Sequence, residues 1–160
     1  MMSEHVTTDE GSVLAGGLPY LPYPPRLTAS TEPFWSGLVE GEFRTTKCRA
    51  CQHISFPPKP ICPACWSRDV EWVAMSGRGI LASFTEVSAA PKVFAAETPY
   101  VLALVDLEEG VRCLSRILAP YDDLRVGIPV RLKIRPAQPL YLFDFVPDMS
   151  RDVLGGTKDD

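Results

Sequence analysis

The chain has 160 residues, of which 46% are hydrophobic and 22% charged, and its net charge is -4. This length suits one ordinary core with a small additional module, and it excludes two large domains. The composition is that of a folded globular protein, and the acidic balance argues against a protein dedicated to nucleic acid.

No secretory or membrane segment is visible in the sequence. Residues 1–10 carry Glu4, Asp9 and Glu10 where a signal peptide has cations. No stretch approaches the roughly 18 continuous apolar residues of a membrane-spanning helix. We therefore expect a cytoplasmic protein with reduced thiols and no membrane association.

Residues 1–30 show no sustained hydrophobic period and contain four prolines between positions 19 and 25. Proline fixes φ and removes a backbone donor, so this segment is expected to be an extended arm. Part of the arm is expected to pack, either on a partner or on its own domain, because it contains the apolar residues Leu18, Tyr20, Leu21 and Tyr23.

Residues 31–41 predict a short helix with a role in docking. Thr31 suits the N-cap, Pro33 suits the first turn, and Gly41 is a plausible end. Phe34 and Leu38 then form one apolar stripe, which must pack on another surface because so short a helix does not persist alone.

The strongest motif is a pair of C-x-x-C knuckles, Cys48/Cys51 and Cys62/Cys65, separated by ten residues. Two such knuckles aim four thiolates at one point, which predicts a rubredoxin-like zinc ribbon over residues 42–76. A closed shell of four thiolates leaves no position for substrate, so the zinc is expected to be structural. Iron remains chemically possible with the same ligands. Residues 41–78 carry six cations against three anions, which is first explained as compensation for the negative metal cluster.

Residues 77–148 predict a small β domain, and residues 149–160 a disordered tail. Alternating and fully apolar runs are separated by turns such as Glu109-Gly110, and residues 120–127 interrupt the pattern with a turn or one helical turn. An OB-type barrel of five strands accounts for this spacing. The strands are expected at 80–87, 100–107, 111–118, 130–135 and 141–146.

Two further residues with possible chemistry have simpler explanations. His53 follows a complete thiolate set, so we expect it to be exposed or to lie outside the ligand shell. Cys113 alternates with Val111 and Ile117 in a predicted strand, which is typical of a buried free cysteine. No motif places a base near it, so a catalytic thiol is not expected.

The order of several short motifs resembles the acyl-CoA-associated family of zinc-ribbon plus OB-fold proteins, catalogued as a domain of unknown function (type thirty-five). The resemblance runs from about residue 33 to residue 146. The motifs are Pro33-Phe34-Trp35-x-Gly37, the two knuckles with Phe56-Pro57-Pro58 between them, Glu71-Trp72, Ser76-Gly77-x-Gly79, Pro99-Tyr100, Glu109-Gly110 and Gly127-x-Pro129-Val130.

The resemblance implies an accessory subunit of a thiolase-superfamily enzyme, either a thiolase or a retro-aldolase, and not a catalyst acting alone. It further implies a heterotetramer in which coenzyme A or an acyl-CoA is held jointly with the partner. The sequence departs from the family at Gln52 and Trp66, where the knuckles usually have glycine at a position that favours positive φ.

Arg131, Lys133 and Arg135 are cations that a strand period of two places on one face. They are candidates for binding the phosphates of coenzyme A, although a plain solvated barrel face is the simpler explanation, because an outer strand normally alternates charged residues with apolar ones. A zinc-ribbon and OB module for single-stranded nucleic acid is the alternative function. The barrel region 79–148 argues against it, because it carries seven cations against nine anions.

Overall fold

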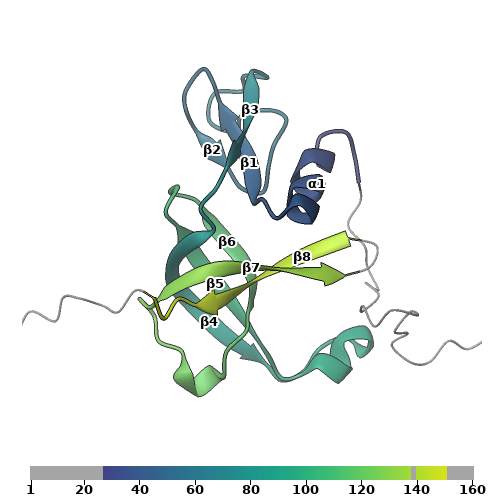
Figure 1. Cartoon of the computed structure of the whole chain (residues 1–160), viewed down its shortest axis with the longest axis vertical. Coiled ribbons are helices and arrows are strands. Elements are labelled where there is room, and N and C mark those ends of the chain that lie inside the picture. Colours follow the sequence, from purple (N-terminus) through teal and green to yellow (C-terminus); the bar gives the residue numbers. More distant parts are fainter. Residues whose placement is uncertain (1–26, 138–139, 151–160) are drawn as a thin grey trace, which may run out of the picture.

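A computed structural model describes residues 27–137 and 140–150 and shows a helix, a three-stranded sheet and a closed five-stranded barrel (Figure 1). The expected class, mainly β with a zinc ribbon followed by an OB-type barrel, is confirmed. The elements are α1 (Glu32–Glu40), β1 (Arg44–Cys48), β2 (Ile54–Ser55), β3 (Val70–Ala74), β4 (Arg78–Val87), η1 (Lys92–Glu97), β5 (Tyr100–Leu107), β6 (Arg112–Ile117), η2 (Tyr121–Asp123), β7 (Pro129–Ala137) and β8 (Leu140–Pro147).

Residues 1–26 of the predicted arm and 151–160 of the predicted tail lie outside the described residues. Within the described ranges, no helix is long and apolar enough to cross a membrane.

β1 is the central strand of the small sheet, whose order is β2-β1-β3. It runs antiparallel to β3, with Arg44 opposite Ala74 at one end and Cys48 opposite Val70 at the other. Ala74 leads into the barrel, so the Cys48 end of the ribbon points away from it (Figure 1). The first cysteine knuckle of the predicted metal module therefore lies at the end of the ribbon that is remote from the barrel.

Helix α1 ends at Gly41, which adopts the left-handed conformation with φ 83°. The apolar stripe of this helix is used inside the chain: Phe34 and Leu38 are 5% and 1% exposed. The helix packs on β8 of the barrel and on β1 of the ribbon. These two side chains are thus unavailable to a partner, and a docking role for the helix stays a prediction that would rest on its outer residues, such as the exposed Val39.

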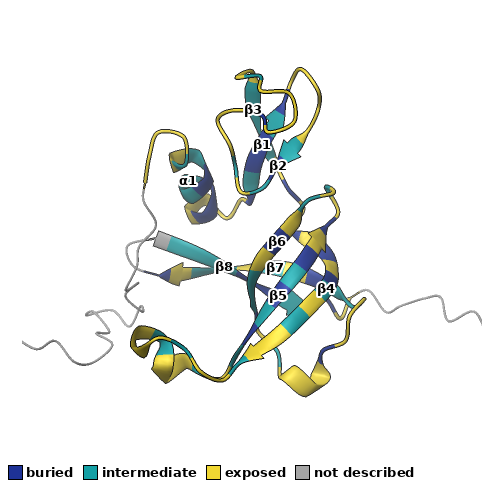
Figure 2. Cartoon of the chain, turned by 180° about the vertical axis from the view of Figure 1, so that it is seen from behind, coloured by how far each residue is buried: buried dark blue, intermediate teal, exposed yellow. Residues whose placement is uncertain are grey.

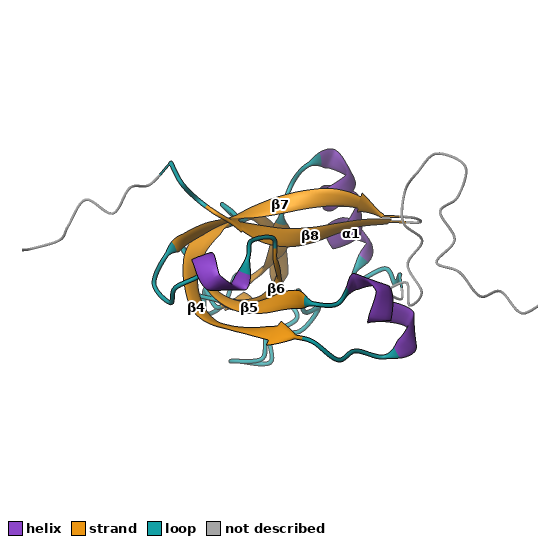
Figure 3. Cartoon of the chain, turned by 90° about the horizontal axis from the view of Figure 1, so that it is seen from below, coloured by secondary structure: helices purple, strands orange, loops and turns teal. Residues whose placement is uncertain are grey.

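The barrel has the strand order β4-β5-β6-β8-β7, with β4 pairing with both β5 and β7 (Figure 3). The parallel pair Ile117 and Phe145 closes β6 against β8. β4 contains a register shift between Leu81 and Ser83. Such a bulge increases local bending, which helps a sheet of five strands to close.

Strands β4, β7 and β8 begin earlier or end later than the sequence predicts, and β6 is shorter by one residue at each end. η2 falls inside the predicted interruption at 120–127. The 3-10 helix η1 was not predicted; it follows Pro91 and has no buried residue.

An aromatic cluster joins the ribbon, the helix and the barrel. The Phe143 ring of β8 lies 5.2 to 6.2 Å, between centroids, from Phe34, Phe43 and Phe56, which come from α1, from the segment before β1 and from the segment after β2. Phe145, two residues further along β8, is fully buried in the barrel core. In Figure 2, residues coloured as buried occur in α1, in β1 and in the barrel strands. One strand therefore serves both the barrel and its junction with the ribbon.

Candidate functional site

The two cysteine knuckles have the same backbone geometry. In the first, the Gln52 amide donates to the Cys48 carbonyl over 2.9 Å; in the second, the Trp66 amide donates to the Cys62 carbonyl over 2.9 Å. Gln52 and Trp66 adopt φ 63° and 61°, so both hold the left-handed conformation in which glycine is usual. Each position costs on the order of 1 kcal/mol for a residue with a Cβ.

The knuckles bring the four predicted cysteines together, with all four Sγ atoms within 4.8 Å of one another. The Sγ atoms of Cys48 and Cys65, and those of Cys51 and Cys62, are each separated by 3.6 Å. In a tetrahedral site with Zn–S bonds of about 2.3 Å, the sulfurs stand about 3.8 Å apart. The donor set therefore fits a structural zinc, and its four thiolates fill the shell.

Hydrogen bonds within the cluster shift the pKa values of the thiols in opposite directions. The Cys51 amide donates to the Cys48 sulfur and, with other donors, lowers the pKa of Cys48 to about 7. The Ser67 amide acts in the same direction on Cys65, but the neighbouring thiols Cys51 and Cys48 outweigh it and raise the pKa of Cys65 to about 12. Four sulfurs this close cannot all ionise without a cation, so the geometry is suited to a metal rather than to free thiolates.

His53 and Cys113 are not part of this cluster. The His53 side chain is exposed, and its carbonyl accepts the Cys48 amide. Cys113 is 1% exposed in the barrel core, where burial raises its pKa to about 12. The burial of Cys113 agrees with its place in the predicted strand, and a thiol in that state is a poor nucleophile.

The three candidate cations on β7 have different environments. Arg131 and Lys133 are exposed, whereas Arg135 is partly buried and its Nε donates to the carboxylate of Asp144 on β8. Asp144 is only 2% exposed, so the charge of Arg135 already has a partner in the chain.

A further cation, which the sequence analysis missed, joins this face of the barrel. Arg78 of β4 is directly opposite Arg131 in the β4/β7 pair. Directly opposed residues project to the same face, so two like charges meet there. Asp148 is close enough for both arginines to help lower its pKa, although the Ser150 hydroxyl is the larger cause. We call Arg78, Arg131 and Lys133 the basic face.

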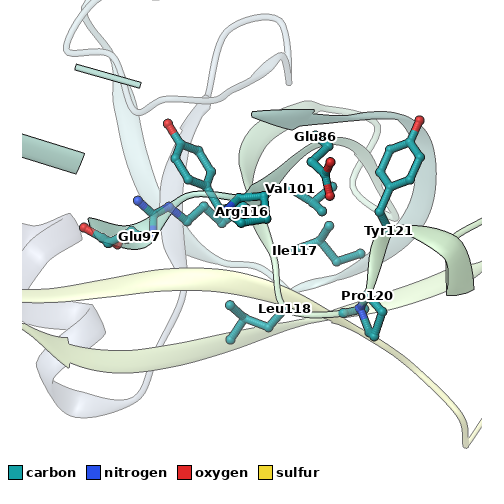
Figure 4. Close-up of a pocket in the computed structure, with 11 residues that line it drawn as sticks. Glu86, Glu97, Val101, Arg116, Ile117, Leu118, Pro120 and Tyr121 are labelled. Atoms are coloured by element: carbon teal, nitrogen blue, oxygen red, sulfur yellow. Dashed lines mark hydrogen bonds and ion pairs between the residues drawn. The ribbon is translucent and has the colours of Figure 1, made fainter. Parts of the chain in front are cut away.

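A separate pocket of about 410 Å³ opens where the ends of β4, β5 and β6 meet η2 (Figure 4). Val101 and Ile117 lie at its floor and are buried, and Glu86 and Tyr121 lie on one side. Residues of the basic face do not line it.

Arg116 lines the opposite side of the pocket. Its guanidinium lies 4.3 Å from the centre of the Tyr100 ring and is ion-paired with Glu97 (Figure 4). Because this cation is already neutralised and Glu86 adds a carboxylate, the pocket is poorly suited to phosphate. Its apolar floor suits a hydrocarbon group instead.

Two family models match successive parts of the chain. A rubredoxin-like zinc ribbon domain of ChsH2 matches residues 35–71, and a C-terminal OB-fold domain of ChsH2 matches residues 72–135. The boundary between the two matches lies within β3.

Relatives and a solved structure agree with these matches. A DUF35 domain-containing scaffold protein of Methanocaldococcus jannaschii is 34% identical over 56% of this chain and 64% of its own. The benzoylsuccinyl-CoA thiolase subunit BbsA of Geobacter metallireducens is 32% identical over 56% of this chain and 60% of its own. The chain thus covers less than two thirds of the length of each of these two relatives. A chain of the Ltp2-ChsH2(DUF35) aldolase has a TM-score of 0.69 and 32% identity, over 78% of this chain and 98% of that one.

Proposed function

The chain belongs to the DUF35 family of zinc-ribbon and OB-fold proteins, and we propose that it is a non-catalytic accessory subunit of a thiolase-superfamily enzyme. The partner would be a thiolase or a retro-aldolase acting on an acyl-CoA, and the assembly a heterotetramer. The observation that carries this proposal is the similarity to a chain of an aldolase, which this protein matches over 98% of that chain at 32% identity.

The four-cysteine cluster supports an accessory rather than a catalytic role. Four thiolates complete the tetrahedral shell of a zinc ion, so Cys48, Cys51, Cys62 and Cys65 would bind it without leaving a position for substrate or water. The metal then supplies a fixed shape to a ribbon too small for its own core.

The basic face supports a part in holding the coenzyme A thioester. Arg78 and Arg131 oppose each other across two strands, and the carboxylate of Asp148 near both offsets only part of the charge of the three cations, so a further anion would be stabilised there. Phosphate oxygens of coenzyme A are such an anion, and Lys133 lies two residues along the same strand. Arg135, paired with Asp144, would position this strand rather than bind the ligand.

Reconstitution of the enzyme tests the accessory role. Affinity purification of the full chain from its native cells, followed by identification of the bound protein, provides the thiolase-like enzyme. We expect that enzyme to turn over its acyl-CoA at least tenfold faster with the chain than without it, because positioning of the thioester lowers the activation barrier. Equal turnover in both cases would contradict the proposal.

Charge removal tests the basic face in the same complex. We expect the double variant Arg131→Ala and Lys133→Ala to raise KM for the acyl-CoA about tenfold, since hydrogen bonds to charged groups contribute about 1.5 to 3 kcal/mol. Arg112→Ala is the control, because Arg112 is an outward cation of β6 that is paired with Asp106. A KM that changes equally in both variants, or in neither, would remove the basic face from ligand binding.

A further inference from the structure

The two knuckles have the same backbone geometry, but the side chains of their left-handed residues, Gln52 and Trp66, have different surroundings. The Gln52 side chain serves its own knuckle, since its Nε2 donates to the Arg49 carbonyl over 3.0 Å. The Trp66 side chain is 79% exposed, and within the part of the chain that the structure describes it makes no hydrogen bond or ring contact.

Trp66 is therefore costly to the free subunit in two ways. Its backbone holds φ 61°, a conformation that glycine adopts without strain. Its large apolar indole stays mostly in water and so gains little free energy from burial. A residue with both costs is most simply explained by a contact made outside this chain.

We infer that Trp66 is a docking anchor that inserts into an apolar pocket on the thiolase-like enzyme, an inference that rests on the proposed function. Tryptophan is enriched among the residues that dominate binding energy at protein interfaces. The anchor lies in the knuckle loop at the end of the ribbon remote from the barrel, where Figure 2 shows exposed loops. The Trp66 amide donates to the Cys62 carbonyl, and a metal bound by the four cysteines would fix this knuckle, which lowers the entropy lost on binding.

The surroundings of Trp66 define the chemistry of the partner surface. Ile61, which precedes the same knuckle, is 37% exposed. Lys59 and Arg68 are exposed too, and within residues 27–137 and 140–150 neither forms an ion pair. On the other knuckle, by contrast, Arg49 is paired with Asp69 and Glu71. The complementary surface is an apolar pocket with carboxylates at its rim.

Glycine substitutions separate docking from stability. Trp66→Gly removes the indole and also the backbone strain, so we expect an unchanged or higher urea midpoint, an unchanged zinc content, and binding to the purified thiolase-like enzyme weakened on the order of 30-fold. Gln52→Gly is the matched control: it relieves the same strain in the first knuckle and should leave the Kd unchanged. Trp66→Phe, which keeps an aromatic ring, should lose less affinity than Trp66→Gly.

The outcomes distinguish this docking site from the function on which it rests. A native chain that binds no thiolase-like enzyme overturns the proposed function and the docking site together. Native binding that Trp66→Gly leaves intact, or that Gln52→Gly weakens equally, overturns the docking site alone. Trp66-dependent sedimentation with vesicles of anionic phospholipid, in place of enzyme binding, would also overturn it and assign the indole to a membrane surface.

Discussion

Gly79 and Gly110 show two different reasons for glycine in this chain. Gly79 lies in β4 against β5, where an added Cβ would come within 2.7 Å of Val105 Cγ1 and closer still to the Asp106 carbonyl oxygen. Gly110, in the β5–β6 turn, has φ 78° and no atom within 4 Å of an added Cβ. At position 79 a side chain is excluded by crowding, whereas at position 110 glycine is favoured only by the left-handed backbone conformation.

Alanine substitutions at the two positions should distinguish steric crowding from backbone strain by the loss of stability that each causes. We expect Gly79→Ala to lower the free energy of unfolding by about 3 kcal/mol, because two strands must move apart. Gly110→Ala should cost about 1 kcal/mol, because only the left-handed conformation is penalised. Urea denaturation followed by circular dichroism measures both values. Equal losses would show that Gly79 is not limited by crowding.

Single residues were predictable from sequence where their chemistry depends on local spacing. The cysteine knuckles are defined by separations of a few residues, and the unusual Gln52 and Trp66 could be identified from the same motif. Arg78 could not be identified, because its position opposite Arg131 depends on the pairing register of two strands far apart in the sequence. Neither could the ion pair of Arg135 with Asp144, which requires the register of β7 against β8.

Among the elements, the strands were predicted well and their shared contacts were not. Alternating and fully apolar runs bounded by turns located β4 to β8, and the run over β5 is apolar on both faces. The aromatic cluster around Phe143 was missed, because its four rings come from separate segments and each looks locally like an ordinary core residue. η1 was missed for another reason: its residues are unburied and carry no hydrophobic period.

Among the contacts between elements, those of the Phe143 ring should contribute most to the stability of the junction between the barrel, α1 and β1. We expect Phe143→Ala to lower the free energy of unfolding by about 3 kcal/mol, toward the low end for loss of a phenylalanine since the side chain is only partly buried. The same change should increase amide hydrogen exchange in α1 and β1, whose aromatic neighbours lose a contact. Leu114→Ala is the control, because Leu114 also lies on a barrel strand but is 62% exposed, and it should cost less than about 0.5 kcal/mol. Increased exchange in β4 and β5 alone would contradict this role of Phe143.

At the scale of the whole molecule, the ribbon and the barrel depend on different sources of stability. The barrel has a continuous core that includes Leu81, Val105, Ile117 and Phe145. The ribbon has three short strands, of which β2 contains two residues, and it relies on the four-cysteine cluster at one end and the aromatic cluster at the other. Loss of the metal should therefore affect the two parts unequally.

Zinc removal tests that division. We expect chelation to lower the melting temperature and to abolish amide protection in β1 and β3, because apparent binding energies of structural zinc are about 10 to 16 kcal/mol and the ribbon has little else to hold it. Strands β4 to β8 should keep their protection, since their core does not include the knuckles. Hydrogen exchange before and after chelation, with zinc returned as the control, measures both effects. An unchanged melting temperature would remove the structural role of the metal, while loss of protection throughout the barrel would show that Phe143 and its neighbours couple the two parts into one cooperative unit.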